Sequence, residues 1–295
     1  MDYDFITTCN WTSTGTYTMQ AFRGGFSNIV TSVSLFYRKK GDASWTETTN
    51  GEVVIASTGE WEIANDWNKS GNDCLFHNYQ NKTDIDKCTA VTFNSPGTNV
   101  GNNFLLRIWK NCTNLKSMPE FVIPSGITTV GDYFLYEAWQ GCTSLTTMGT
   151  NFQVGTGITT AGDYFLGYAW RYDNLTFMPV GFDIPSGLTT VGDDFFFYTW
   201  NGCTKLASMP VGFDIPSGLT TVGDDFFTNA WTDCTALKND GDLTEPITFE
   251  FTTGATPFGG TCPITSDSPI VGTKETPVEI EVNRYVPSGA FFQLF

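Results

Sequence analysis

The sequence predicts an α+β repeat solenoid, with a short helix and a short parallel strand in each coil, between β-rich N- and C-terminal regions. The first observation is a set of glycines spaced 30, 31, 30 and 31 residues apart: Gly101, Gly131, Gly162, Gly192 and Gly223. A set of tryptophans repeats this spacing: Trp109, Trp139, Trp170, Trp200 and Trp231. The third observation is that residues 178–196 and 209–227 share one sequence, MPVGFDIPSGLTTVGDDFF. Such a period indicates stacked supersecondary units.

One coil is represented by residues 123–148, IPSGITTVGDYFLYEAWQGCTSLTTM. It begins with a PSG turn signal and a β-branched ITTV strand. A short helix is then expected, with the Asp132 carboxylate capping its first N–H groups and Gly141 near its end. The buried face of this helix is formed by residues at i, i+1, i+4 and i+5: Phe134, Leu135, Ala138 and Trp139. The alternating segment SLTTM predicts a second short strand.

The same apolar offsets recur after each repeat glycine. No single coil can bury such a face by itself, so we expect the coils to stack and share one apolar interior. The short strands of neighbouring coils then line up in parallel, about 4.8 Å apart. The solenoid is predicted to span residues 99–240 as about five coils.

The flanking regions do not repeat. Residues 1–98 contain the β-rich segments FITTCNW, TYTMQAF, SVSLFYRKK and GEVVIAS, with a turn signal at KKGDAS. They predict a β-sandwich-like N-terminal domain that caps the solenoid core. Residues 241–295 are also β-like, and their apolar end, AFFQLF, is expected to dock on this chain or on a neighbouring copy. A homo-oligomer formed through the β-rich termini is therefore expected.

The repeat pattern IPSGLTTVGDDFF, followed by Trp, GCTKL and SMP, resembles the BspA-like leucine-rich repeats. Units of that family read roughly IP-x-x-(V/L)-T-x-I-G-x-x-(A/F)-F-x-x-C-x-x-L, and the resemblance covers residues 99–240. It implies a leucine-rich-repeat-like solenoid and a non-catalytic surface role in adhesion or recognition. A weaker likeness, to surface and phage tail-fibre proteins, lies in GEWEIANDWNKSGNDC at residues 59–74.

Composition excludes several classes of function. The chain has 31 acidic and 15 basic residues and a net charge of −16, so it has no general attraction for nucleic acid or anionic lipid. A single histidine, His77, excludes multi-histidine metal sites, and no cofactor motif is present. No window is apolar enough to span a membrane, and the first residues, MDYDFITTCNW, lack the features of a signal peptide. We expect an extracellular, cell-surface or virion location, reached after leader removal or by another route.

Two columns of equivalent residues have both a chemical and a structural interpretation. The tryptophans could form a row of sugar-stacking platforms, but they share a face with Phe and Leu, which favours burial in the core. The aspartates that follow the repeat glycines are Asp132, Asp163, Asp193 and Asp224. At about one coil apart, a pair of them could act as glycosidase carboxylates or hold calcium. Capping of each helix explains their repetition better, so neither a catalytic nor a metal site is predicted.

The cysteines leave alternatives open. Four of them follow a repeat tryptophan by three residues: Cys112, Cys142, Cys203 and Cys234. Asp173 takes this position in the middle coil, which leaves two pairs in neighbouring coils. Disulfides are sterically allowed there, although buried free thiols are the favoured interpretation. Cys74 and Cys88 flank the domain junction and form a possible disulfide.

The most informative positions are those that differ between otherwise copied coils, directly before and after each tryptophan. Helix geometry directs the preceding pairs away from the core, and several are aromatic or charged, as recognition surfaces often are. The predicted binding residues are Tyr136, Glu137, Tyr168, Arg171, Tyr172, Phe197 and Tyr198. Neutral drift on an exposed face is the alternative explanation.

These patterns bear on three possible functions. The sequence favours a non-enzymatic surface or virion protein that recognises a protein or glycan partner through the variable face. The alternative is a structural subunit of a capsid, fibre or filament, in which the exposed aromatics are subunit contacts. A glycan-cleaving enzyme is disfavoured, because no carboxylate pair stands apart from the repeat.

Overall fold

The structure is a computed structural model. The residues that it describes are 6–18, 20–23, 35–48, 52–65, 73–77, 88–94, 98–118, 121–149, 152, 154–179, 182–207, 216, 218–236, 247–250 and 279–282. Within these ranges the chain forms strands and turns and no helix. Accordingly, no described segment is a helix of the length and apolarity that a membrane crossing requires.

The N-terminal part is built around a six-stranded sheet in the order β12-β9-β1-β7-β4-β5. Its strands are β1 (Ile6–Trp11), β4 (Leu35–Lys39), β5 (Thr46–Glu47), β7 (Gly59–Asn65), β9 (Cys88–Asn94) and β12 (Phe121–Val122). Neighbours run antiparallel except for β9 and β12, which are parallel. Two strand pairs accompany this sheet: β2 (Gly15–Thr18) with β6 (Glu52–Ile55), and β3 (Gln20–Arg23) with β8 (Asp73–His77). Because β12 follows the first coil in sequence, its pairing with β9 joins the sheet to the repeats.

Alternation along the strands fills the core of this region. In β6, Val53 and Ile55 are buried while Glu52 and Val54 are exposed, as a half-buried strand requires. The predicted turn at KKGDAS connects β4 to β5, with Gly41 at φ 96°. Trp11 and Tyr17 pack with ring centroids 4.2 Å apart, which brings β2 against the main sheet.

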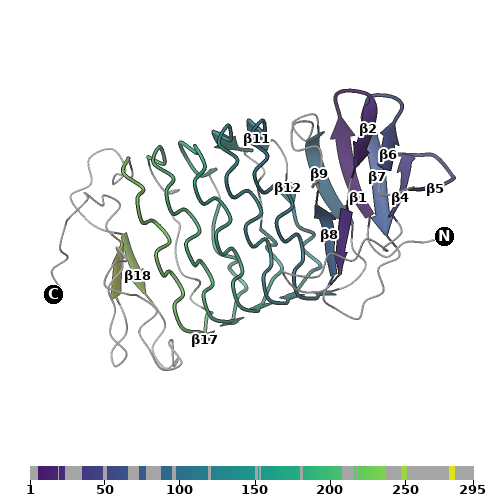
Figure 1. The fold of residues 1–295 in the computed structure, drawn as a ribbon. Coiled ribbons are helices and arrows are strands. Elements are labelled where there is room, and N and C mark those ends of the chain that lie inside the picture. The colour runs from purple at the N-terminus through teal and green to yellow at the C-terminus, as the bar shows by residue number, and fades with distance from the viewer. Residues whose placement is uncertain are drawn as a thin grey trace.

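The repeats form a stack of coils with a parallel ladder along each of two edges (Figure 1). One ladder is the five-stranded sheet β10 (Asn99–Val100), β13 (Thr129–Val130), β15 (Thr160–Ala161), β16 (Thr190–Val191) and β17 (Thr221–Val222). The other contains β11 (Ser117–Met118) and β14 (Thr147–Met148), and a bridge from Thr147 to Phe177 extends it. Equivalent residues pair in register, as Thr129 does with Thr160, so each coil lies directly on the previous one.

Each coil contains a segment that we call the arc, running from the repeat glycine to the position three residues after the tryptophan. The prediction that the arcs are helices is wrong, and with it the α+β fold class, because the described arcs are successions of turns. Alternate N–H groups bond within the arc to the carbonyl three residues earlier, as Ala138 N does to Leu135 O at 3.1 Å. The intervening N–H groups cross to the next coil, as Trp139 N does to Ala169 O at 2.8 Å. Since these groups are directed at a neighbour, the i→i−4 ladder of an α-helix cannot form.

Left-handed backbone conformations bend the arcs into this shape. The tenth residue after each repeat glycine has positive φ: Asn111, Gly141, Tyr172, Gly202 and Asp233. Gly, Asn and Asp adopt this region at the lowest steric cost, so four of the five coils carry a favourable residue there. Tyr172, at φ 65°, is the exception.

The predicted helix caps have a different role. Asp132 Oδ1 accepts the backbone N–H of Asp163 at 3.1 Å, and Asp163 Oδ1 accepts that of Asp193 at 2.9 Å. Asp193 continues the ladder to Asp224 N at 2.7 Å, and Asn102 begins it below Asp132. These side chains therefore satisfy backbone N–H groups between coils instead of capping helices within them.

The interior of the stack consists of columns of aromatic rings. The repeat tryptophans are buried and stacked, with successive centroids 5.1–5.9 Å apart. The first phenylalanine of each arc forms a parallel column with spacings of 4.5–5.6 Å. The coils thus share one continuous apolar core, and the tryptophans are core residues that no sugar can reach.

At the C-terminal end, β18 (Ile247–Glu250) and β19 (Glu279–Val282) form an antiparallel pair. The remainder of the predicted segment 241–295, including AFFQLF, lies outside the described residues.

Candidate functional site

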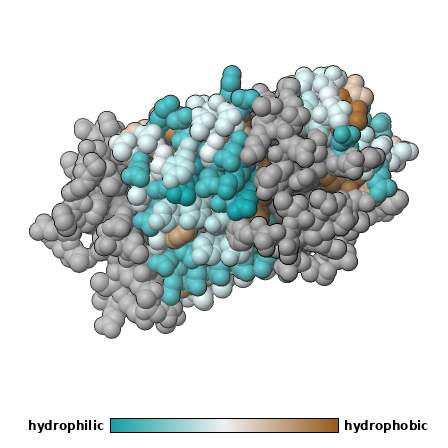
Figure 2. Space-filling model, viewed as in Figure 1, coloured by the Kyte–Doolittle hydropathy of each residue, from teal (hydrophilic) through white to brown (hydrophobic). Residues whose placement is uncertain are grey.

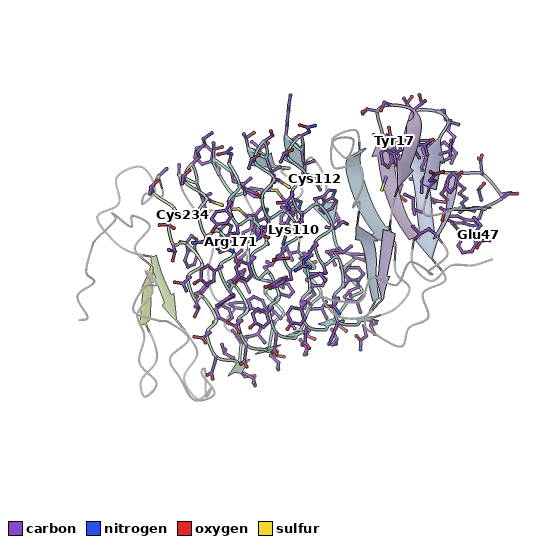
Figure 3. All side chains as sticks on the ribbon, in the orientation of Figure 1. Tyr17, Glu47, Lys110, Cys112, Arg171 and Cys234 are labelled. Atoms are coloured by element: carbon purple, nitrogen blue, oxygen red, sulfur yellow. The ribbon has the colours of Figure 1, made fainter. Side chains whose placement is uncertain are left out.

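Residues alternate in pairs along each arc between the core and the surface. The positions directed away from the core are the second, fifth, sixth, ninth and tenth after the repeat glycine, and we call the face that they form the outer face. Some of its residues, such as Gln140 and Asn201, are nevertheless buried. In Figure 3, Lys110 and Arg171 lie on the arcs that carry it. Figure 2 shows that the described part of the stack is largely hydrophilic to neutral in that view, with small hydrophobic patches.

The centre of the outer face is a mosaic of aromatic rings from the second to fourth coils. Tyr133 stacks on Tyr164 at a centroid distance of 5.1 Å, and Tyr168 stacks on Tyr198 at 5.3 Å. Tyr136 bridges the two rows with edge contacts to Tyr164 and Tyr168 at 5.7 and 5.4 Å. Because these rings are packed against one another, they form a rigid surface.

Glycine makes room for two of these rings. At Gly167 a Cβ would lie only 2.8 Å from Cδ2 of Tyr136, and at Gly202 it would collide with the ring of Tyr172. Each tyrosine therefore rests on the backbone of the coil that follows its own. A glycine at an outer-face position can thus indicate that an aromatic ring of the preceding coil packs there.

Arg171 occupies the middle of the mosaic. Its guanidinium carbon lies 4.4, 5.0 and 5.5 Å from the ring centroids of Tyr172, Tyr168 and Tyr198. Nε donates to Asn201 Oδ1 at 2.9 Å, and Nη2 donates to the Tyr172 hydroxyl at 2.6 Å. Burial raises the pKa of Tyr168, and the charge of Arg171 opposes that rise. The structure therefore holds a cation among tyrosine rings on an otherwise acidic protein.

The two ends of the outer face differ in charge. On the first two coils, Glu137 is 8% exposed and forms ion pairs with Arg107 and, at 2.8 Å, with Lys110. On the fourth coil, burial raises the pKa of Asp194 to about 6, its hydrogen bond with Tyr164 opposes the rise, and Asp225 adds to it. The face thus runs from a neutralised basic end to an acidic end.

The structure brings the seven predicted binding residues together on this face. Six of them form one connected cluster, since Tyr168 contacts Tyr136, Phe197 and Tyr198, and Arg171 joins Tyr172 to it. Glu137 differs from its prediction, because it is buried within an ion-pair cluster. The prediction missed Tyr133 and Tyr164, which complete the mosaic. Their position also varies between coils, but the sequence pattern places it at the start of a predicted helix, outside the variable pairs beside each tryptophan.

The aspartate column bears on the alternatives of calcium binding and glycoside cleavage. Its carboxylates are engaged by backbone N–H groups, as described above, and burial raises the pKa of Asp163 while the Asp193 N–H opposes that rise. Among the described residues, no three or more His, Cys, Asp or Glu side chains are grouped so that they could hold a metal ion.

The repeat cysteines are free, buried thiols. Three of them donate Sγ–H to the carbonyl of the preceding coil's tryptophan: Cys142, Cys203 and Cys234, at 3.0, 2.9 and 3.0 Å. Burial raises the pKa of all three thiols. Unreactive, hydrogen-bonded core residues have this character, whereas reactive cysteines have lowered pKa values.

Asp173 stands in the same column and is 1% exposed. Neither carboxyl oxygen has a hydrogen-bond partner among the described residues. The nearby N–H groups of Gly141 and Cys142 donate instead to Arg171 O and Trp139 O. Burial raises the pKa of Asp173 well above its usual range, and the nearby backbone N–H groups of Cys142 and Gly141 oppose that rise.

Three predicted residues have side chains outside the described part of the structure. The backbones of Cys74 and His77 lie in β8 and that of Cys88 lies in β9. The Cys74–Cys88 disulfide therefore remains a prediction, and His77 has no assigned role.

Comparison with known proteins gave no match to a family model, to a curated protein or to a solved structure. The role of the outer face must accordingly be inferred from its own chemistry.

Proposed function

We propose that this chain is a non-enzymatic recognition protein, outside the cell or on a virus particle, that binds a protein or glycan partner through the outer face of its coil stack. The observation that carries the proposal is the contrast between the two sides of each arc. The core positions repeat almost the same residue types from coil to coil, whereas the outer positions carry tyrosines in the middle coils only, with Arg171 among them.

The chemistry of this mosaic suits binding. Tyrosine and arginine offer large contact areas and hydrogen-bond donors, and both are enriched where binding energy concentrates. Tyr172 is 51% exposed, which makes it one of the few large aromatics of the described residues that remain open to solvent. Packing of the rings fixes their orientations, so little conformational entropy remains to be lost when a partner binds.

The test uses a labelled full-length chain on an array of glycans and glycoproteins. The variant Tyr172→Ala removes the exposed ring of the outer face. The matched control, Phe177→Ala, removes a ring that is 57% exposed and lies outside the arcs, on the ladder that contains β11 and β14. We expect the unmodified protein and the control to bind the same ligands, and Tyr172→Ala to lose that binding.

Two results would contradict the proposal. One is that no arrayed ligand binds, or that the two variants lose binding equally. The other is an assembly, imaged by electron microscopy, in which copies of the chain bury the outer face against one another. That result would favour a structural subunit instead.

A further inference from the structure

Four cations of the described residues form ion pairs with carboxylates, and Arg171 is not among them. Arg38 pairs with Glu62, Lys40 with Glu60, and both Arg107 and Lys110 with Glu137. Around Arg171, the described residues place an amide oxygen and a tyrosine hydroxyl within hydrogen-bonding distance, and no carboxylate within ion-pairing distance. A charge that is held in position but not neutralised is prepared for an anion from outside.

The surroundings fix this guanidinium in place. Three tyrosine rings lie within 5.5 Å of it, and Asn201 is itself anchored by donating to Thr232 O at 3.1 Å. Arginine presents several donors in a planar fork, of which the two contacts named above use part. The unused donors suit the two oxygens of a carboxylate.

Tyr172 supplies a flat apolar surface beside the charge. Its hydroxyl accepts from Arg171, its ring lies on Gly202 of the next coil, and half of its surface is open to solvent. An aromatic ring of this kind offers a platform for the C–H groups of a sugar ring, with a charged donor at its edge.

The geometry points to a binding site for a carboxylate-bearing sugar, a uronic or sialic acid unit of a glycan, with its carboxylate on Arg171 and its ring on Tyr172. This inference rests on the proposed recognition function and names its ligand class. One unpaired guanidinium matches a single carboxylate. Polyanions such as nucleic acids or densely sulfated chains are disfavoured, because Asp194 and Asp225 lie on the next two coils of a chain with net charge −16.

The experiment titrates defined sugars into the full-length protein by isothermal calorimetry. The acidic probes are sialyllactose and trigalacturonate, and the matched neutral probes are lactose and galactotriose. We expect at least one acidic probe to bind more tightly than its neutral counterpart. Arg171→Gln should weaken that binding roughly tenfold or more, as the loss of a charged hydrogen bond does. Arg171→Lys, which keeps the charge but not the fork, should weaken it less. Lys205→Gln, which removes an exposed cation outside the cluster, should leave it unchanged.

Several outcomes would overturn the inference. Equal binding of acidic and neutral probes would do so, as would no binding of any probe, or binding that survives Arg171→Gln. If neutral sugars bind in a manner that needs Tyr172 but not Arg171, the acidic-sugar inference fails while the recognition function stands. Absence of any ligand in the array experiment would remove both.

Discussion

Replacing Asp173 with cysteine should stabilise the protein, and the gain should grow with pH. The buried carboxyl of Asp173 has no hydrogen-bond partner among the described residues, and a buried unsatisfied polar group costs about 1–3 kcal/mol. The thiol of Asp173→Cys would instead have the arrangement of Cys142 and Cys203, whose Sγ atoms donate to tryptophan carbonyls of the preceding coil. At about pH 4, where the folded carboxyl is protonated, we therefore expect a gain in unfolding free energy of about 1–3 kcal/mol.

The pH dependence follows from the direction of the pKa shift. Burial raises the pKa of folded Asp173 above the unfolded value of 3.8, so the folded state binds the proton more tightly. The protonated carboxyl's contribution to stability is fully present below the unfolded pKa, and it is lost as the pH rises through the folded pKa. Between those two values the unmodified protein should lose stability relative to the variant by about 1.4 kcal/mol per pH unit.

The assay is urea unfolding followed by tryptophan fluorescence at about pH 4 and about pH 7. Asp173→Asn serves as a control, because it removes the ionisable group but leaves a polar one unsatisfied. Like Asp173→Cys, it should remove the fall in unfolding free energy between pH 4 and pH 7. Its gain at pH 4 should be smaller than that of Asp173→Cys. A gain from Asp173→Cys that is absent, or that is equal at the two pH values, would refute this account of the buried carboxyl.

The remaining predictions concern the ladders and the core. Gly192→Ala should destabilise the fold by about 1–3 kcal/mol in urea unfolding, because its Cβ would lie 2.7 Å from the backbone N of Asp163, whereas Gly187→Ala, with no neighbour closer than 3.6 Å, should be nearly neutral. The folded pKa of Asp194 is raised to about 6, so this carboxyl contributes to the free energy of unfolding at low pH, and that contribution is lost as the pH rises. Asp194→Asn should therefore reduce the loss of unfolding free energy between about pH 4 and pH 6 by roughly 1 kcal/mol, a value lowered to allow for the half exposure of the side chain. Trp170→Ala should lower the free energy of unfolding by about 3–5 kcal/mol in the same assay, because its ring is buried in the tryptophan column. Phe177→Ala should lower it by less than about 0.5 kcal/mol, because that ring is exposed. Similar losses for the two variants would contradict the shared core.

The stacking and its core could be predicted from sequence, but the backbone of the arcs could not. Phe134, Leu135, Ala138 and Trp139 are fully buried, as their spacing indicated. That spacing alternates two inward and two outward residues, a period of four that an α-helix and this chain of turns both satisfy. The choice between them depends on hydrogen bonds to another coil, which no local pattern encodes.

Some residues did carry a signal for the arcs. Gly141 is predicted to lie near a helix end, but it occupies a position that has positive φ in every coil. Asparagine or aspartate takes this position in two of the other coils. The aspartate column was expected to repeat for a structural reason, and it does, but its N–H partners lie one coil away. The binding residues were found because variable positions stand out against copied ones, whereas their packing with Tyr133 and Tyr164 depends on the coil spacing.

The most direct test of the coil-to-coil backbone is the scalar coupling across hydrogen bonds, measured by NMR on deuterated, isotope-labelled protein. The structure predicts a coupling between the amide nitrogen of Trp139 and the carbonyl carbon of Ala169, which lies in the next coil. A coupling of the Trp139 nitrogen to the carbonyl of Leu135, four residues earlier in its own coil, would show an α-helix and contradict the stacked arcs on which the outer face depends.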